Sequence, residues 1–229
     1  MDIQADSNEF GRRFVSAIDQ FQYQQARRIA RDAVKHFKTL LADNSNGDAA
    51  LNAALFSAVL FRGLFDYAQL AERTSDPKWT DDRAAIQDVW RNLCDCRDRI
   101  TFVARVSSGQ ISARIFTALD KVESWYAQRF GSGVYSSPEI LVKRELCSIC
   151  NRDIRRCEHI AGDVYQGRIC YRIPKDISLK SSSMVLVPHD RRCRIWPWQL
   201  KGRVVSDILL MTTFRVDDFL DNDEWGTTT

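Results

Sequence analysis

The chain is organised around one stretch of sequence, Cys147-Ser-Ile-Cys150-Asn-Arg-Asp-Ile-Arg-Arg-Cys157-Glu-His159-Ile-Ala-Gly162-Asp-Val-Tyr165-Gln-Gly167-Arg-Ile-Cys170. Two cysteines separated by two residues form a knuckle that presents both sulfurs to one ion, and Cys157 with His159 can complete a tetrahedron. The sequence therefore predicts a Cys3His zinc site made by Cys147, Cys150, Cys157 and His159, with one zinc ion per chain. Four protein ligands close the coordination shell, so the predicted role of the zinc is structural rather than catalytic.

An alternative interpretation is that these cysteines are buried free thiols, because a free cysteine behaves as a small hydrophobic residue. Their neighbours argue against it, since they are polar or charged: Asn151, Arg152, Asp153, Arg155, Arg156 and Glu158. Cys170 and His189 remain as alternative ligands in place of His159. Cys94 and Cys96 lie two residues apart on a predicted helix and point to different sides, which argues against shared metal binding.

Cysteine usage and hydropathy indicate a cytoplasmic protein. Four of the seven cysteines lie in the stretch 147–170, a pattern that favours metal binding in a reducing compartment over a secreted disulfide framework. Residues 1–9 are polar and acidic, unlike a signal peptide. The longest apolar run, 49–61, is interrupted by Asn52 and Ser57 and is too short to span a membrane. We therefore expect no membrane partner.

The first 130 residues carry apolar side chains at helical spacing and predict a bundle of about five α-helices. The expected helices begin near Ser7, near Phe21, at Asp48, after an N-cap at Thr80, and after Gly109. The helix from Asp48 is apolar nearly all round, so it is expected at the centre of the bundle. Residues 1–7 are expected to be a frayed start.

The composition changes after Gly131. Glycine, serine and proline in 131–138 predict a linker over 131–142, with a short helix from Pro138 to Glu145 leading into the knuckle. Segments 168–173 and 183–187 favour strands, whereas 204–211 fits either a strand or a short helix. The predicted fold class is α+β, with a helical bundle at 1–130, the linker, a zinc-binding β-rich module at 143–215 and an acidic tail at 216–229.

The spacing around the knuckle also carries a resemblance. The pattern C-x2-C-x6-C-x-H-I-x-G-x-x-Y-x-G-x-x-C is followed by Met184-Val-Leu-Val-Pro188-His-Asp-Arg-Arg-Cys-Arg-Ile195. This region, about 143–196, resembles a small zinc-bearing β-module of phage structural and maturation proteins, including prohead-protease-like chains, and of uncharacterised bacterial proteins. Met184 and His189 differ from the residues that are usual at these positions of the module. The resemblance implies a phage or bacterial setting and supports the four predicted ligands, but no residue set for proteolysis is visible.

Charge is unevenly distributed along the chain. The formal net charge is +3, yet 143–203 holds fourteen Lys and Arg against six Asp and Glu, and 216–229 holds five acidic residues and no basic one. A basic module followed by an acidic tail suggests either an anionic partner or a tail that folds back on the module.

Nucleic-acid binding is one functional hypothesis. Seven arginines of the basic module can contact phosphates: Arg152, Arg155, Arg156, Arg168, Arg191, Arg192 and Arg194. Tyr165, Tyr171 and Trp196 are available for stacking on bases. The alternative is that these arginines form a solvated surface that the acidic tail balances.

The leading hypothesis is a non-enzymatic adaptor or regulatory subunit of a bacterial or phage-related assembly, including antiphage defence, with a protein partner or a second copy of the chain. The sequence contains no phosphate-binding glycine loop, no paired carboxylate motif and only three histidines. Aromatic residues of the kind that anchor interfaces follow the module: Trp196, Trp198, Phe219 and Trp225. The alternative is that these rings fill a small core.

A ribonuclease is the third hypothesis. Arg31 and His36 match the R-x4-H spacing of the helical ribonuclease family known as HEPN, and this resemblance implies an arginine that stabilises phosphate charge and a histidine that acts as acid or base. In that family the motif usually falls on a later helix. Residues five apart on a helix are also displaced by about 140°, so a dimer or a kink would have to bring both to one site.

Overall fold

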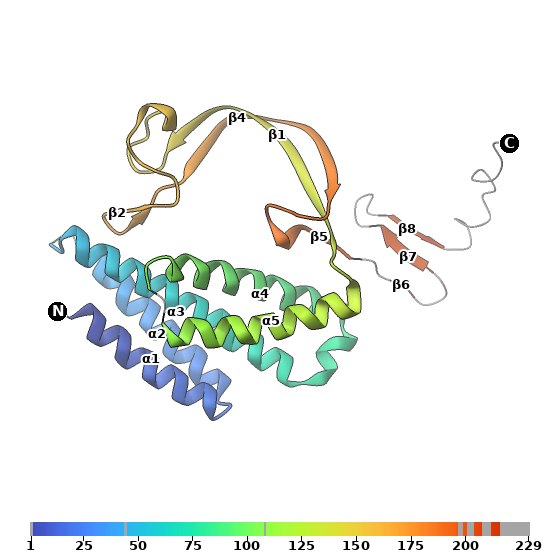
Figure 1. The fold of residues 1–229 in the computed structure, drawn as a ribbon, viewed down its shortest axis with the longest axis horizontal. Helices are drawn as coiled ribbons and strands as arrows, with labels where there is room; N and C mark the ends of the chain where they lie inside the picture. Colours follow the sequence, from blue (N-terminus) through green and yellow to red (C-terminus); the bar gives the residue numbers. More distant parts are fainter. Residues whose placement is uncertain are drawn as a thin grey trace. The chain divides into compact units, whose positions relative to one another are not determined.

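A computed structural model describes residues 2–43, 45–107 and 109–196, together with strand backbone at 199–200, 204–207 and 212–215. Five α-helices precede a strand-rich region, so the predicted α+β class with an N-terminal helical bundle is confirmed (Figure 1). The helices are α1 (Ile3–Asp19), α2 (Tyr23–Ala42), α3 (Asp48–Ser75), α4 (Arg83–Ala104) and α5 (Gln110–Phe130), with a short 3₁₀ helix η1 (Pro77–Asp81) before α4. The predicted acidic tail, 216–229, lies outside the described residues.

Aspartate N-caps start α1 and α4. The Asp2 carboxylate accepts hydrogen bonds from the backbone N–H groups two and three residues ahead, each at 3.1 Å, so α1 begins at Ile3 and the predicted frayed start is wrong. Asp82 accepts from the N–H two residues ahead at 2.9 Å, and it takes the place predicted for Thr80, which lies in η1. A carboxylate suits this position because it pairs an otherwise unsatisfied N–H and faces the positive end of the helix dipole.

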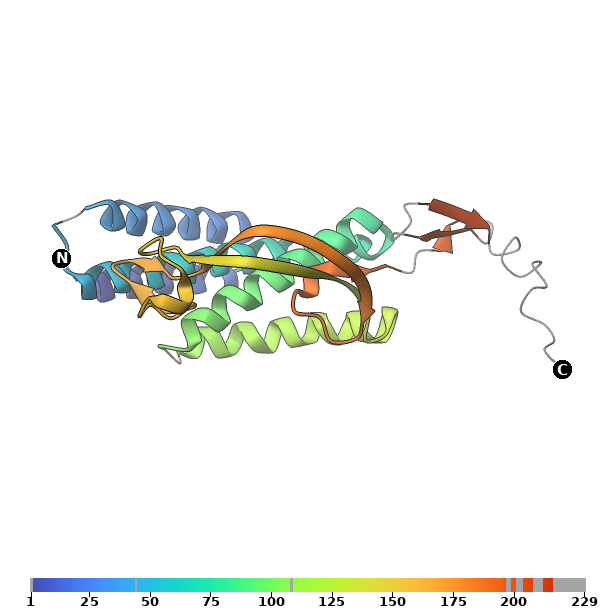
Figure 2. The same ribbon diagram turned by 90° about the horizontal axis from the view of Figure 1, so that it is seen from above.

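The helix α3 is central to the bundle, as its apolar composition predicts. It packs against α1, α2 and α4, and Phe61, Leu64 and Leu70 on it are buried (Figures 1 and 2). By length and composition α3 also qualifies as a membrane span, which the sequence analysis did not predict; among the described helices it alone does. A core helix passes the same criterion, and the contacts of α3 are those of a core helix.

A buried carboxylate joins α3 to α4. Asp66 is 3% exposed and forms ion pairs with Arg99 and, at 3.5 Å, with Arg62. Burial raises the pKa of Asp66 to about 6, and the two guanidinium groups oppose that shift. The helices approach closely here, since a Cβ on Gly63 would lie 2.9 Å from Cδ1 of Ile100. The Asp66 carboxylate is therefore buried where α3 and α4 approach closely, and Arg99 reaches it from α4.

The strands form three small sheets. The first has the order β4-β1-β5, from β1 (Val134–Cys147), β4 (Arg172–Val185) and β5 (Arg194–Ile195), and β1 pairs antiparallel with β5 through Val134–Ile195 and Tyr135–Arg194. The second is an antiparallel hairpin of β2 (Val164–Tyr165) and β3 (Arg168–Ile169). The third joins β6 (Gln199–Leu200), β7 (Val204–Asp207) and β8 (Thr212–Arg215) in that order, so 204–207 is strand rather than helix.

The strand β1 corrects two predictions. It occupies most of the interval predicted as a linker, 131–142, and all of the predicted short helix from Pro138 to Glu145. Gly131 and Gly133, with φ of +66° and +90°, turn the chain out of α5 and into this strand. The strand state depends on hydrogen bonding to β4, which is a distant segment that local propensity does not register. The predicted strand 168–173 is divided between β3 and the start of β4, and β4 runs on into the predicted strand 183–187 as far as Val185.

The chain forms two compact units whose limits differ from the predicted domains. The first unit is Met1–Val122 with Val142–Ile177, and the second is Glu123–Leu141 with the described part of Ser178–Thr229. The cysteine-rich stretch 147–170 therefore belongs with the helical bundle, whereas the end of α5 belongs with the later strands. The predicted boundary at 131–142 does not separate the two units, because each unit contains residues from both sides of it.

We expect Arg99→Ala to lower the free energy of unfolding by about 3 kcal/mol, because it leaves the buried Asp66 carboxylate without its closest cation. Arg91→Ala is the matched control on α4, since Arg91 forms an exposed pair with Asp88 that is worth at most about 1 kcal/mol. Urea unfolding followed by circular dichroism measures both. Equal effects of the two variants would contradict the assignment.

Candidate metal centre

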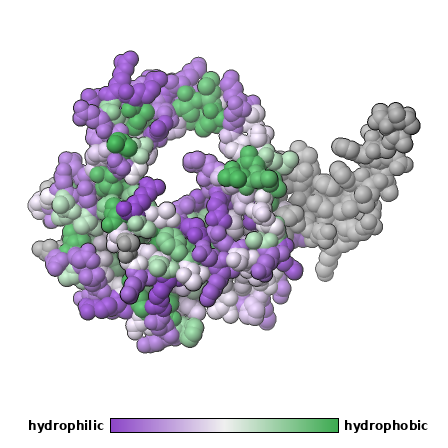
Figure 3. Space-filling view, in the orientation of Figure 1, coloured by the Kyte–Doolittle hydropathy of each residue, from purple (hydrophilic) through white to green (hydrophobic). Residues whose placement is uncertain are grey.

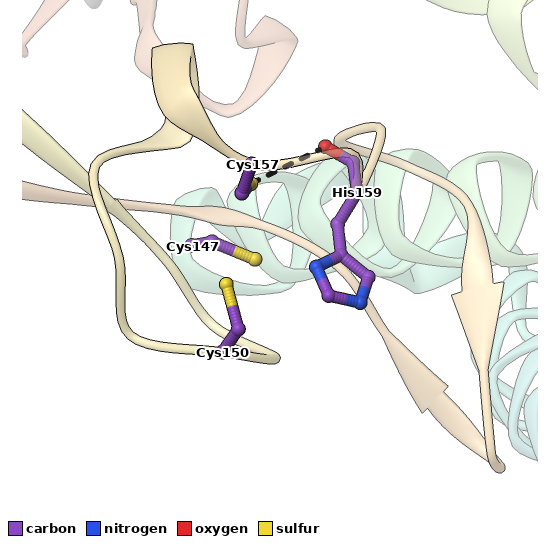
Figure 4. A group of neighbouring side chains, drawn as sticks. All are labelled: Cys147, Cys150, Cys157 and His159. Atoms are coloured by element: carbon purple, nitrogen blue, oxygen red, sulfur yellow. Dashed lines mark hydrogen bonds between the residues drawn. The ribbon is translucent and has the colours of Figure 1, made fainter.

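Four side chains of the first unit converge on one point. The possible ligand atoms of Cys147, Cys150, Cys157 and His159 all lie within 4.8 Å of one another. Figure 4 shows the sulfurs of Cys147 and Cys150 side by side, with Cys157 and the imidazole ring facing them from the other arm of the loop. The structure therefore brings together the four residues that the sequence predicts as ligands, and this cluster can hold a metal ion.

Backbone hydrogen bonds shape the knuckle at the end of β1. The N–H of Asn151 donates to the carbonyl of Cys147 at 2.8 Å, and the N–H of Cys147 donates to the carbonyl of Arg152 at 2.8 Å. Asn151 has a φ of +57°, a left-handed conformation that asparagine tolerates better than most residues. The N–H of Ile149 points at the Cys147 sulfur, 3.4 Å away. The turn thus orients both cysteines of the C-x2-C pair and directs an N–H dipole at one sulfur.

The imidazole of His159 is held ready for a ligand. Its Nδ1 is buried and has no hydrogen-bond partner among the described residues. The ring packs edge-on against Tyr165, with 4.7 Å between ring centroids, and the Tyr165 hydroxyl accepts a hydrogen bond from the N–H of Ile160 at 3.0 Å. A buried, unpartnered nitrogen costs free energy unless something binds it. A metal ion would satisfy this atom.

Hydrogen bonds also tune the acidity of the thiols. Burial raises the pKa of Cys147, but two backbone N–H groups of the knuckle and the thiols of Cys170 and Cys150 outweigh it and bring that pKa down to about 7. The backbone and side chain of Arg152 lower the pKa of Cys150, whereas burial raises the pKa of Cys157. The thiolate is the form that binds metals, so the knuckle favours the state that a metal requires.

The alternative ligands lie outside the four-residue cluster. Cys170 is buried, and its sulfur lies 3.7 Å from the sulfur of Cys147, so it flanks the cluster at one ligand. Burial raises the pKa of Cys170 to about 11. His189 is exposed and belongs to the second unit. Cys94 and Cys96 are buried in α4, where the Cys96 thiol donates to the Gly63 carbonyl at 3.3 Å.

The β2–β3 hairpin seats the cysteine-rich stretch on the bundle. Its turn residues Gln166 and Gly167 both have positive φ, +51° and +69°, as a two-residue turn between antiparallel strands requires. The N–H of Gly167 donates to Oδ1 of Asn52 on α3 at 2.8 Å. A Cβ on Gly167 would lie 2.7 Å from Cδ2 of Leu41 and 3.1 Å from Cβ of Leu51, so only glycine fits. Sequence analysis missed this contact, although Tyr-Gln-Gly-Arg is a turn signal.

The predicted phosphate-binding arginines of the first unit are exposed, but three of them have intramolecular partners, one of them being Arg152, whose side chain hydrogen-bonds to Cys150. Arg152, Arg155, Arg156 and Arg168 all reach solvent. Arg155 forms an ion pair with Asp153 at 2.7 Å, and Arg168 donates to the carbonyl of Ser148 at 2.7 Å. These two guanidinium groups therefore hold the knuckle and its flanking loop in place.

The arginines of the second unit are also tied to the protein. Arg191 and Arg192 form ion pairs with Glu123 at 2.8 Å and with Asp190 at 2.9 Å. Arg194 is buried and donates to the carbonyl of Gly131 at 2.9 Å. The prediction that Arg194 contacts phosphate is wrong, because this guanidinium closes the turn that follows α5.

The predicted aromatic anchors divide into one core residue and three that lie outside the description. Trp196 is 5% exposed and packs against Tyr126 and Phe130 of α5, with ring centroids 5.9 and 5.6 Å apart. Its prediction as a partner-binding residue is therefore corrected, since an interior ring has no surface to offer. The side chains of Trp198, Phe219 and Trp225 fall outside the described residues.

The structure does not bring Arg31 and His36 to one site. The guanidinium of Arg31 lies over the ring of Phe65 on α3, 5.7 Å from its centroid. Nε2 of His36 lies 2.9 Å from the carboxylate of Asp6 on α1. The two side chains contact different helices, as their angular separation on α2 predicts. The arrangement offers no support for the HEPN-like acid–base pair.

Comparisons with known proteins give no match. No protein-family model matches this chain, and no match was found among curated proteins or solved structures.

We expect Cys147→Ser and Cys157→Ser each to abolish stoichiometric metal binding and to unfold the stretch 147–170, while α1–α4 stay helical, because the bundle has its own core. Cys193→Ser is the matched control, since Cys193 is exposed and outside the cluster. Metal analysis and far-ultraviolet circular dichroism provide the measurements. Unchanged metal content in the two ligand variants would refute the site.

Gly167→Ala should release the hairpin from the bundle, because the added Cβ meets Leu41 and Leu51 and the residue has positive φ. We expect a loss of about 1–3 kcal/mol in the free energy of unfolding and faster hydrogen exchange in 160–170. Gly47→Ala is the control, since a Cβ there meets nothing within 4 Å and φ is −71°. Protection of 160–170 equal to that of the native chain would show that the contact is dispensable.

Proposed function

We propose that this chain is a non-enzymatic, zinc-stabilised adaptor or regulatory subunit that binds another protein chain. Three thiolates and one imidazole are a soft, tetrahedral donor set of the kind that favours Zn²⁺, and a zinc ion bound there would act as a structural cross-link. Cys147, Cys150, Cys157 and His159 would hold it. A closed set of four protein ligands leaves no position for water, which supports a structural role over a catalytic one.

The observation that carries the binding role is an apolar row on the β1–β4 ribbon. The Ser181 hydroxyl donates to the Glu139 carboxylate at 2.6 Å, so these two residues share one face of the ribbon. Side chains alternate along a strand, which puts Leu141 on the same face as Glu139, and Leu179 on the same face as Ser181. Leu179 is 68% exposed and Leu141 is 44% exposed. We define Leu141 and Leu179, both of the second unit, as the ribbon patch.

The rest of the sheet leaves the ribbon patch exposed to solvent. Almost every residue of β4 is exposed, and β5 extends the sheet only beside Val134 and Tyr135. Two-stranded ribbons are only marginally stable in water by themselves, and burial of their exposed apolar groups against a partner is favourable. Figure 3 shows hydrophobic surface on the β1–β4 ribbon in this view. The proposed occupant is therefore a protein with a complementary apolar surface.

Features of the strands favour contact through this face rather than through the strand edge. Pro138 and Pro174 lack the N–H that a ladder needs, and Asp176 has a φ of +52°, which interrupts the regular geometry of β4. Natural sheets use such features to prevent pairing of exposed edges. A partner that covers the side chains of the ribbon patch fits these constraints better than one that adds a strand.

Nucleic-acid binding has weaker support. Six of the seven predicted arginines have an ion pair or a hydrogen bond within the protein: Arg152, Arg155, Arg168, Arg191, Arg192 and Arg194. Phosphate binding would have to compete with those contacts. The setting that we propose is a bacterial or phage-related assembly, as the resemblance of 143–196 implies. Seven free cysteines suit a reducing cytoplasm.

A pull-down with the purified chain, followed by native mass measurement, tests the proposal. We expect a stoichiometric complex with a partner protein or a second copy, and we expect Leu179→Lys to weaken it about tenfold or more, because the variant puts a charge in the ribbon patch. Lys180→Glu is the matched control, since Lys180 is exposed and points to the opposite face of β4. A monomer without partner, or equal binding by both variants, would contradict the proposal.

A further inference from the structure

A fourth thiol lies next to the candidate metal centre without belonging to its four donors. The sulfur of Cys170 lies 3.7 Å from that of Cys147, and both residues are buried. The backbone holds the two segments together here, because the N–H of Ser148 donates to the carbonyl of Tyr171 at 3.0 Å. Across the chain, Cys94 and Cys96 are enclosed in α4 and Cys193 belongs to the second unit. Cys170 is thus the thiol placed to react with the candidate metal ligand Cys147.

We propose that Cys147 and Cys170 form a redox-active thiol pair, a modification site at which a peroxide oxidant forms a disulfide. The sulfurs would move from 3.7 Å to a bond length of about 2.05 Å, a shift that side-chain rotation can supply while the backbone stays in place. Access comes from the other side of the centre, since Cys150, Cys157 and His159 are only partly buried. Hydrogen peroxide is small enough to enter there.

The reaction balances with hydrogen peroxide as the sole oxidant. The Cys147 thiolate attacks the peroxide, so an S–O bond forms, the O–O bond breaks and hydroxide leaves. That hydroxide takes the Cys170 proton and becomes water. The Cys170 thiolate then attacks the oxidised sulfur, so the S–S bond forms, the S–O bond breaks, and a solvent proton turns the second hydroxide into water. Two electrons pass from the two sulfurs to the peroxide.

Formation of the disulfide would release the metal ion, and it would also act on the loop that leads into the β2–β3 hairpin. A disulfide sulfur is no longer a thiolate donor, so the centre would keep three of its four ligands. Cys170 also anchors the loop before β2, because its N–H donates to the carbonyl of Asp163 at 2.8 Å and its carbonyl accepts from the N–H of Gly162 at 2.8 Å. The release of the ion rests on the proposed zinc site, whereas the disulfide needs only the two sulfurs.

Peptide mapping of the full chain tests the thiol pair directly. The purified protein is treated with hydrogen peroxide, free thiols are alkylated and the digest is analysed by mass spectrometry, while a chromogenic chelator records zinc release. We expect a Cys147–Cys170 disulfide, release of zinc, and recovery of zinc binding after reductant and zinc are added. A disulfide between Cys150 and Cys157 instead would overturn the proposal without contradicting the assignment of the four zinc ligands.

Variants separate the thiol pair from the metal site. Cys170→Ser should still bind one zinc ion per chain, because all four ligands remain, but after peroxide its recovery relative to its own untreated zinc content should be about fivefold lower than that of the native chain, because the Cys147 sulfenic acid has no resolving thiol and oxidises further. Cys193→Ser should recover like the native chain. Equal recovery by Cys170→Ser would overturn the proposal. If the chain as purified holds no zinc, or if Cys170→Ser does not fold, the disulfide mapped in the native sequence still decides the pair.

Discussion

The gathering of four donors within 4.8 Å is the constraint on which the stretch 147–170 depends. This stretch has few apolar side chains of its own and no regular element longer than a single turn or a two-residue strand before β4. A metal ion would supply the free energy that a core supplies elsewhere, since ligand atoms that converge on one ion hold distant parts of a loop together. Nδ1 of His159 shows the need for an ion most clearly, because it is buried and has no hydrogen-bond partner among the described residues.

Seating of the hairpin extends the constraint to the bundle. Gly167 reaches α3 through its N–H bond to Asn52, and Tyr165, at the start of the same turn, supports the His159 ring. The four-donor cluster and the helical bundle are therefore connected through a few residues. In the first unit, the centre positions the knuckle end of the long strand β1, whose other residues carry polar and apolar groups to the surface of the ribbon.

The arginines illustrate how a charge pattern is divided by the fold. Fourteen basic residues in 143–203 read as one basic module in the sequence, but ion pairs with Glu123, Asp153 and Asp190 neutralise three of the arginines locally. Glu123 is distant in sequence from its partner, so composition alone gives no sign of the pair. The ribbon patch is instead an exposed apolar surface. Its residues are far apart along the chain and share one face only because β1 pairs with β4.

The sequence by itself determined the five helices, the α+β class and the four candidate ligands, because those features depend on local periodicity and on short spacings such as C-x2-C. Tertiary structure decided the rest. Strand β1 replaced a predicted linker because its hydrogen bonds go to β4, and Trp196 became a core residue because α5 offers Tyr126 and Phe130 to it. The Asp66–Arg99 pair and the fit of Gly167 against Leu41 and Leu51 likewise join segments far apart in the chain. Such contacts are set by packing in three dimensions, which local residue patterns do not encode.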